Sequence, residues 1–153
     1  MMWIEVKDGA AIEKLMSDFH GFHDSVIVSI SYNSGCYVDE NEVMYQMISA
    51  DEHTLLMTLH SQWSKPIELL FSGVRHCNIA GFRDRYFNDL FDATLEFRTD
   101  LLGETRDDAL IVWADHEGFD IKQHTERFPL ESDYETTYII ANKLKYRILG
   151  EGE

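Results

Sequence analysis

The segment Phe22-His23-Asp24-Ser25 places an aromatic ring, an imidazole, a carboxylate and a hydroxyl in one run, with His20 just upstream. An imidazole beside a carboxylate can transfer protons or bind a metal ion. On a continuous helix the two imidazoles would share one face, and the carboxylate could bind the metal as a third ligand or hydrogen-bond to a ligating imidazole. The spacing therefore admits a small hydrolase or metal-dependent enzyme built on His20, His23 and Asp24.

A structural interpretation of the same residues is favoured. Gly21 lies between the two imidazoles and predicts a left-handed turn that ends the helix and separates them. Polar side chains at such a junction satisfy backbone groups left open where a helix gives way to a strand. Catalysis would also need a third group in the same cavity, such as His60 or His76. We expect no catalytic residue, metal or cofactor, and a structural junction made of Phe22, His23, Asp24 and Ser25.

The junction lies between an amphipathic helix and a strand. Apolar residues recur at helical spacing at Ile12, Leu15, Met16 and Phe19, and Asp8 is a suitable N-cap. From residue 24 onward the period changes from 3.6 to two, as expected of a strand with one core face. The residues predicted for that core face are Val26, Val28, Ile30 and Tyr32, in an alternation with serines that only Ile27 interrupts.

Most of the remaining chain shows strand patterns separated by turns. Strands are predicted at 3–6, 43–49, 54–60, 67–72, 74–79, 91–98, 109–114 and 137–148, and a helical turn at 84–90. The absence of repeated intervening helices argues against a parallel sheet. We predict one domain over 1–153 of the α+β class, mostly β: a curved antiparallel sheet or sandwich of about seven to eight strands with one N-terminal amphipathic helix packed on it. An irregular acidic excursion is expected near 115–135.

The net charge of the chain indicates which classes of partner it can bind. The chain carries 28 acidic and 13 basic residues, for a net charge of −15. This charge repels nucleic acid and anionic membranes and attracts basic proteins, although acidity can also serve solubility alone. The N-terminus lacks signal-peptide features, no apolar run approaches a membrane span, and Cys36 and Cys77 are expected to be free thiols. We expect a cytoplasmic protein that binds neither nucleic acid nor membrane.

The acidity is concentrated near the predicted excursion. Residues 100–135 contain eleven acidic and three basic residues, with interleaved aromatic residues of the kind that dominate interfaces. The alternative is a solvated loop whose aromatic residues pack into the core. The residues predicted to bind a partner are Trp113, Asp115, Glu117, Phe119 and Asp120.

Several short segments resemble a known group of proteins. The runs GFHDSVI at 21–27, IELLFSGV at 67–74, IVWAD at 111–115 and KLKYR at 143–147 resemble small bacterial proteins that share a Phe-His-Asp-Ser start. Their order is similar to that of one class of immunity proteins in bacterial polymorphic-toxin systems. The resemblance implies a helix leading through a His-Asp step into antiparallel strands. It also implies a protein that neutralises a cognate toxin without catalysis of its own.

Three functions follow as hypotheses. The favoured one is a non-enzymatic cytoplasmic binding protein, such as an immunity protein that neutralises a basic toxin through an acidic surface. The second is the hydrolase or metal-dependent enzyme built on His20, His23 and Asp24. The third is a homo-oligomeric accessory protein, for instance a homodimer, whose edge strand pairs with its twin.

Overall fold

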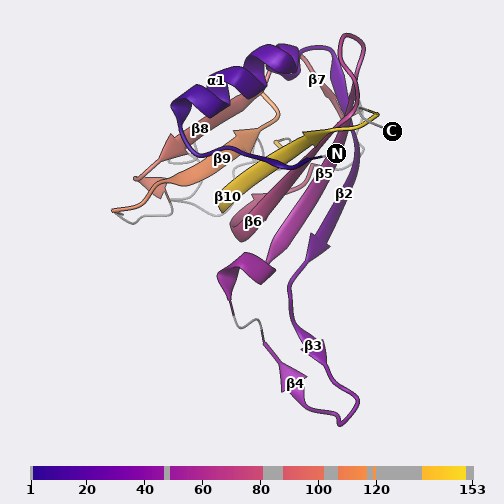
Figure 1. Ribbon diagram of the computed structural model, residues 1–153, viewed down its shortest axis with the longest axis vertical. Coiled ribbons are helices and arrows are strands. Elements are labelled where there is room, and N and C mark those ends of the chain that lie inside the picture. The colour runs from indigo at the N-terminus through magenta and orange to yellow at the C-terminus, as the bar shows by residue number, and fades with distance from the viewer. Residues whose placement is uncertain are drawn as a thin grey trace.

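The computed structural model describes residues 2–46, 49–80, 88–101, 107–116, 119 and 136–150. Seven antiparallel strands form one sheet in the order β7-β2-β5-β6-β10-β9-β8, and the short β1 pairs with β10. The sheet curls into a half-barrel, with one helix near the N-terminus (Figure 1). This mostly-β architecture confirms the predicted fold class. The elements are β1 Ile4–Glu5, α1 Gly9–Asp18, β2 Ser25–Asn33, β3 Tyr37–Val38, β4 Met44–Tyr45, β5 Thr54–Ser61, β6 Ile67–Asn78, β7 Asp89–Leu90, β8 Thr94–Arg98, β9 Leu110–Ala114 and β10 Tyr138–Ile148, with 3-10 turns at His20–Phe22 and Ala50–Glu52.

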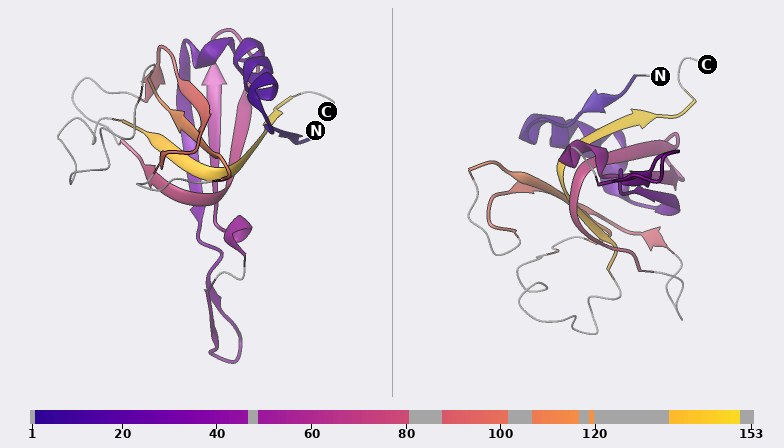
Figure 2. Two further views of the ribbon diagram at one scale, coloured as in Figure 1. Left: turned by 90° about the vertical axis from the view of Figure 1, so that its left-hand side faces the viewer. Right: turned by 90° about the horizontal axis from the view of Figure 1, so that it is seen from below.

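The helix α1 begins where the sequence predicts. The Asp8 carboxylate accepts a hydrogen bond from the Ala11 backbone N–H at 2.8 Å and so caps the first turn. Leu15 and Phe19 are buried in the core, and Ile12 and Met16 pack partly against it. The helix lies near the concave side of the curled sheet, as the two views in Figure 2 show. Its apolar stripe therefore closes one side of the core.

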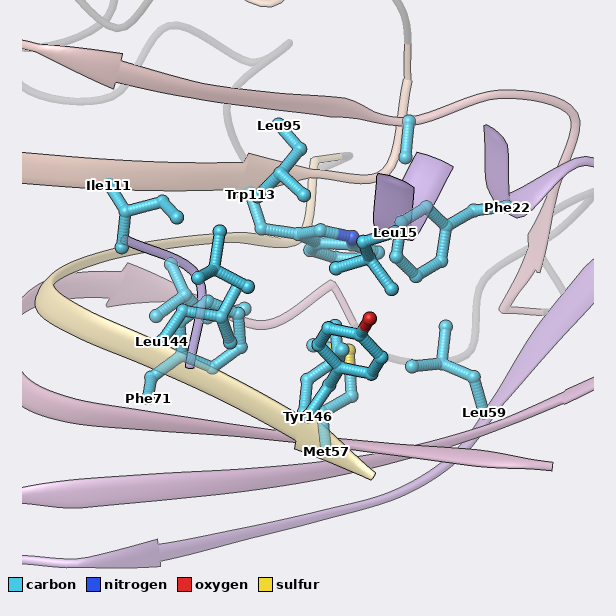
Figure 3. Close-up of a cluster of buried hydrophobic side chains, with 14 of the residues drawn as sticks. Leu15, Phe22, Met57, Leu59, Phe71, Leu95, Ile111, Trp113, Leu144 and Tyr146 are labelled. Atoms are coloured by element: carbon cyan, nitrogen blue, oxygen red, sulfur yellow. The ribbon is translucent and has the colours of Figure 1, made fainter. Parts of the chain in front are cut away.

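The inner core gathers around Trp113 of β9. The indole is completely buried and lies near Leu15, Phe22 and Leu95, with Tyr146 of β10 below them in the view of Figure 3. A second cluster contains alternate residues of β9 and β10 together with Leu101 and Phe119. Because successive residues of β9 belong to different clusters, all five are buried. This confirms the strand predicted at 109–114, which pairs with β10 on one side and β8 on the other.

The strand β2 contains a β-bulge, and up to that bulge its faces are the reverse of those predicted. Ile27 pairs with Leu59 and Ser29 with Thr58, so Val28 is an extra residue in β2. Before the bulge Ile27 packs towards the core, while Val26 is exposed. The predicted core face was therefore wrong for Val26 and Val28. The interruption at Ile27 was the trace of this bulge.

Beyond the bulge the prediction holds for Ile30 but not fully for Tyr32. Ile30 pairs with Met57 and packs against the core. Tyr32 pairs with buried Leu55, yet its side chain is 52% exposed, and its hydroxyl hydrogen-bonds to Nε2 of His53. Tyr32 thus lies at the rim of the sheet.

The pairing of strands in the sheet corrects two other predictions. The first is the helical turn expected at 84–90. Its last two residues, Asp89 and Leu90, instead form the strand β7 and pair with β2. Residues 84–87 lie outside the described part of the chain. The strands expected at 67–72 and 74–79 form one strand, β6, which passes through Gly73. A glycine at positive φ lets the backbone continue where a side chain would stop it.

The basic residues of β10 make polar and aromatic contacts with other elements. Arg147 Nε donates to Glu68 of the adjacent β6 at 2.6 Å, and these residues are directly paired. Lys143 Nζ donates to Asp51 at 2.9 Å. Lys145 and Arg147 both lie over the Trp3 ring. Glu68 lies on the strand paired with β10, whereas Asp51 lies in the 3-10 turn Ala50–Glu52, so sequence order alone does not reveal these partners.

Gly73 offers a sharp test of this packing. Its φ is +66°, and an added Cβ would lie 2.5 Å from Nδ2 of Asn142 on β10. We expect Gly73→Ala to lower the free energy of unfolding by about 2–4 kcal/mol, because left-handed strain adds to the clash. Urea titration measures the change. Gly9→Ala is the matched control, since no atom lies within 4 Å of its added Cβ; an equal loss in both variants would contradict this account.

Candidate functional site

The junction after α1 is a tight left-handed turn. The φ angles of His20, Gly21, Phe22 and Asp24 are 53°, 63°, 64° and 53°. The helix ends at Asp18 with Phe19 as its C-cap, so the left-handed conformation begins at His20 rather than at the predicted Gly21. Non-glycine residues adopt this conformation at a cost, and several in a row persist only where surrounding contacts fix them.

Phe22 supplies the first of those contacts. Its side chain is completely buried and packs edge-on against Phe19 at 5.1 Å and against Trp113 at 5.9 Å between ring centroids. The Ser25 hydroxyl, also buried, donates to the Phe22 carbonyl at 2.6 Å. Burial of this ring thus holds the turn against the core of the sheet.

His23 and Asp24 join the turn to two other loops. Nδ1 of His23 donates to the Phe91 carbonyl, which can only accept, and Nε2 lies 3.3 Å from Asp24 Oδ2. The same Asp24 oxygen accepts from the Trp63 indole N–H at 2.9 Å. The Asp24 carbonyl accepts from the Gln62 N–H at 3.1 Å. All four side chains of the junction therefore make contacts that fasten helix, sheet and loops together.

The structure brings together only some of the groups required for the enzyme hypothesis. His20 bonds to Ser64 Oγ at 2.8 Å and lines a pocket of about 230 Å³ beside Trp63. Asp24 and His60 line a separate pocket of about 390 Å³. His76 bonds to the Tyr138 hydroxyl at 2.9 Å, and desolvation lowers its pKa. Among the described residues, no group of three or more His, Cys, Asp and Glu side chains could hold a metal ion.

The residues predicted to bind a partner are largely buried where the structure describes them. Trp113 forms the inner core, and Phe119 stacks on Tyr138 in the second cluster at 5.0 Å. Asp115 is buried, and its carboxylate accepts from the Thr137 N–H at 3.1 Å. These three side chains pack and hydrogen-bond inside this structure rather than forming one exposed surface, and partner binding through them stays a prediction. Glu117 and Asp120 lie outside the described residues.

Sequence reasoning missed a projecting arm. Residues 34–46 leave the end of β2 as a hairpin that extends well beyond the sheet (Figure 1). Tyr37 pairs with Tyr45 and Val38 with Met44, and the two tyrosine rings stack at 5.0 Å. At the tip, the Asp39 carboxylate accepts from the backbone N–H groups of Asn41 and Val43. The arm is thus a β-hairpin stabilised by its own cross-strand pairs and hydrogen bonds.

The surface of the arm is both apolar and acidic. Tyr37, Val38, Val43 and Met44 are between 48% and 73% exposed. Asp39, Glu40 and Glu42 lie at the tip, in the run from 38 to 43. No Lys or Arg occurs between Lys14 and Lys65, whereas that interval contains seven acidic residues. Two apolar residues, an acidic turn and two more apolar residues were the signal in the sequence that could have revealed the arm.

Comparison with known proteins finds no matching family model, no similar curated protein and no similar solved structure. The likeness to immunity proteins therefore stays a prediction from short sequence segments. Within the described part of the chain, no helix has both the length and the apolar character needed to cross a membrane.

The junction yields a prediction about stability. Phe22→Ala removes a fully buried ring and leaves the left-handed turn without its anchor, so we expect a loss of about 3–5 kcal/mol in the free energy of unfolding. Phe91→Ala is the matched control because that side chain is 72% exposed; its effect should stay within about 0.5 kcal/mol. Denaturant unfolding compares the two. A Phe22 variant as stable as the wild type would show that the turn does not depend on this ring.

The two thiols should differ in reactivity. Burial raises the pKa of the Cys77 thiol, while Cys36 is exposed near the base of the arm. Because the thiolate is the reacting form, iodoacetamide at neutral pH should modify Cys36 at least about tenfold faster than Cys77. Peptide mapping by mass spectrometry follows both rates, and Cys36→Ser should remove the fast phase. Equal rates at the two sites would contradict the burial of Cys77.

Proposed function

We propose that this chain is a non-enzymatic binding protein that holds a basic protein partner through its projecting arm. The observation that carries the proposal is the combination on one hairpin of four exposed apolar side chains and an acidic tip. Exposed apolar residues gathered on one element mark interaction surfaces, whereas singly scattered ones need no explanation. Tyr37 and Met44 supply the aromatic and methionine side chains that are enriched at interfaces.

The shape of the arm favours binding. Stacking of Tyr37 on Tyr45 and the hydrogen bonds to Asp39 hold the hairpin in one conformation before a partner arrives. A surface ordered in advance loses less conformational entropy on association. Projection from the body also lets both faces of the hairpin contact a partner at once. The arm is therefore suited to enter a cleft or to lie along a groove.

Charge selects the chemistry of the partner. The acidic tip and the surrounding interval without Lys or Arg favour a basic surface and disfavour an acidic one. Long-range attraction of this kind accelerates encounter and weakens as ionic strength rises. A basic toxin fits this description, and the resemblance stated above supports an immunity role. Two free thiols suit the reducing cytoplasm in which we place the protein.

The proposed role is tested with the genes beside this one. Each neighbouring reading frame is expressed in a bacterial host alone and together with this chain. We expect one basic product to inhibit growth alone and to become harmless on co-expression, and the two proteins to co-purify at low salt. If every basic neighbour is harmless, or if co-expression gives no protection, the immunity role fails.

Charge neutralisation on the arm gives a quantitative prediction. Glu40→Gln with Glu42→Gln should slow association with that product about three- to tenfold at low salt, with little change in dissociation, because exposed charges mainly steer encounter. Asp39 is left intact because it shapes the tip. The control, Glu13→Gln with Asp107→Asn, removes the same charge from other exposed sites. Surface plasmon resonance measures the rates, and an equal slowing by both pairs would mean that only net charge matters.

A further inference from the structure

A small pocket lies between the end of α1 and β10. Its lining comes from the end of α1 and the turn that follows, from the chain between β5 and β6, and from β6 and β10 themselves. Every residue of this lining belongs to the described part of the chain. The volume of about 230 Å³ is below the roughly 300–1,000 Å³ of sites for drug-sized ligands, so the pocket suits a smaller molecule.

The lining includes a buried apolar part and an aromatic wall. Phe19 and Ile67 are buried and belong to the main core. The exposed Trp63 ring also lines the pocket, and its indole N–H donates to Asp24 at 2.9 Å. That hydrogen bond orients the ring, so the wall is in place before any ligand binds. An aromatic ligand packs favourably against such a ring.

Tyr146 brings a buried hydroxyl to this pocket. The residue is 1% exposed and forms part of the lining. None of the described residues makes a hydrogen bond with its hydroxyl. In Figure 3 the oxygen points towards the side of the core on which Leu15 and Phe22 lie. Buried tyrosine hydroxyls usually have a hydrogen-bond partner, because leaving one unpaired costs free energy. This hydroxyl is therefore a group that a ligand in the pocket can satisfy.

The charges around the pocket favour an uncharged ligand. The Asp18 carboxylate already accepts a hydrogen bond from Lys14 Nζ at 2.5 Å, and Lys65 adds a positive charge to the lining. A cation would therefore meet Lys65, whereas an anion would meet the net charge of −15. Burial raises the pKa of the Tyr146 hydroxyl, and there the charges of Lys14 and Asp18 act in opposite directions. The hydroxyl thus stays protonated at neutral pH and can donate to a ligand.

We propose that this pocket binds a small uncharged aromatic molecule whose carbonyl oxygen accepts a hydrogen bond from the Tyr146 hydroxyl. The ring of the ligand packs against Trp63 and the apolar side chains beside it, and the carbonyl selects the ligand by satisfying the buried donor. Trp63 follows the end of β5, whereas the arm precedes its beginning. The pocket therefore lies away from the arm, and this inference does not rest on the proposed function.

Two matched probes test the site. Acetophenone carries the carbonyl, and ethylbenzene has a methylene group in its place. Each is titrated into the full-length protein and followed by amide NMR. We expect acetophenone to give saturable shifts centred on residues 18–20, 63–67 and 146–148, and to bind at least fivefold more tightly than ethylbenzene. Absence of saturable shifts, shifts centred on another part of the molecule, or equal affinities of the two probes would overturn the inference.

Removal of one oxygen separates the hydrogen bond from general apolar binding. Tyr146→Phe deletes a hydroxyl that no described residue contacts through a hydrogen bond, so we expect the fold to be retained. The affinity for acetophenone should fall at least fivefold, and that for ethylbenzene should stay the same. Tyr45→Phe removes a hydroxyl on the arm and is the matched control, which should change neither affinity. Unchanged acetophenone binding by Tyr146→Phe would contradict the assigned donor.

A second variant tests the aromatic wall and keeps the proposal testable if the core substitution prevents folding. The Trp63 side chain is exposed, so Trp63→Ala leaves the buried core intact. Loss of the indole should weaken acetophenone and ethylbenzene alike, by at least fivefold, because both rings lose the same contact. The dispersion of the NMR spectrum checks that the variant remains folded. A folded variant that binds both probes as the wild type does would overturn the placement of the ligand against Trp63.

Discussion

Burial of one ring organises the junction on which this fold depends. Phe22 inserts between Phe19 and Trp113, and that position requires the chain to turn through several left-handed residues between α1 and β2. The aromatic contacts and the area removed from water offset the backbone strain. The polar side chains that follow can then reach the loops at Trp63 and Phe91. Side chains that suggested catalysis in the sequence therefore stabilise a strained turn between α1 and β2.

The fold class could be predicted because periodicity reports burial directly. The apolar stripe of α1, the continuous run at 109–114 and the alternation in the C-terminal strand all correspond to observed elements. Local irregularities in the strands were harder to predict from the sequence. A single extra residue at Val28 exchanges the faces of β2, and the only sign of it was the misplaced Ile27. Gly73 resembled a break between strands because its role, close approach to Asn142, depends on a residue far along the chain.

The candidate site shows a different reason why sequence alone does not predict the structure. Aromatic residues near clustered carboxylates suggested an interface around Trp113, but the same composition arises where strands bury both faces beside a polar connection. Sequence alone does not say which side of a strand is covered. The arm was missed for the opposite reason, since its strands are only two residues long and leave almost no periodic signal. Its exposure follows from where β2 ends and β5 begins, which is a property of the whole sheet.

The interval without Lys or Arg has one more consequence. Exposed hairpins and loop tips are the places where proteases usually cut a folded domain. Trypsin-like enzymes require Lys or Arg at the cut, and the arm, which projects far beyond the sheet, contains neither. The same segment has no lysine amine for acylation or for attachment of other proteins. The arm thus extends into solvent while remaining chemically inert to two of the commonest reactions that remove or mask such elements.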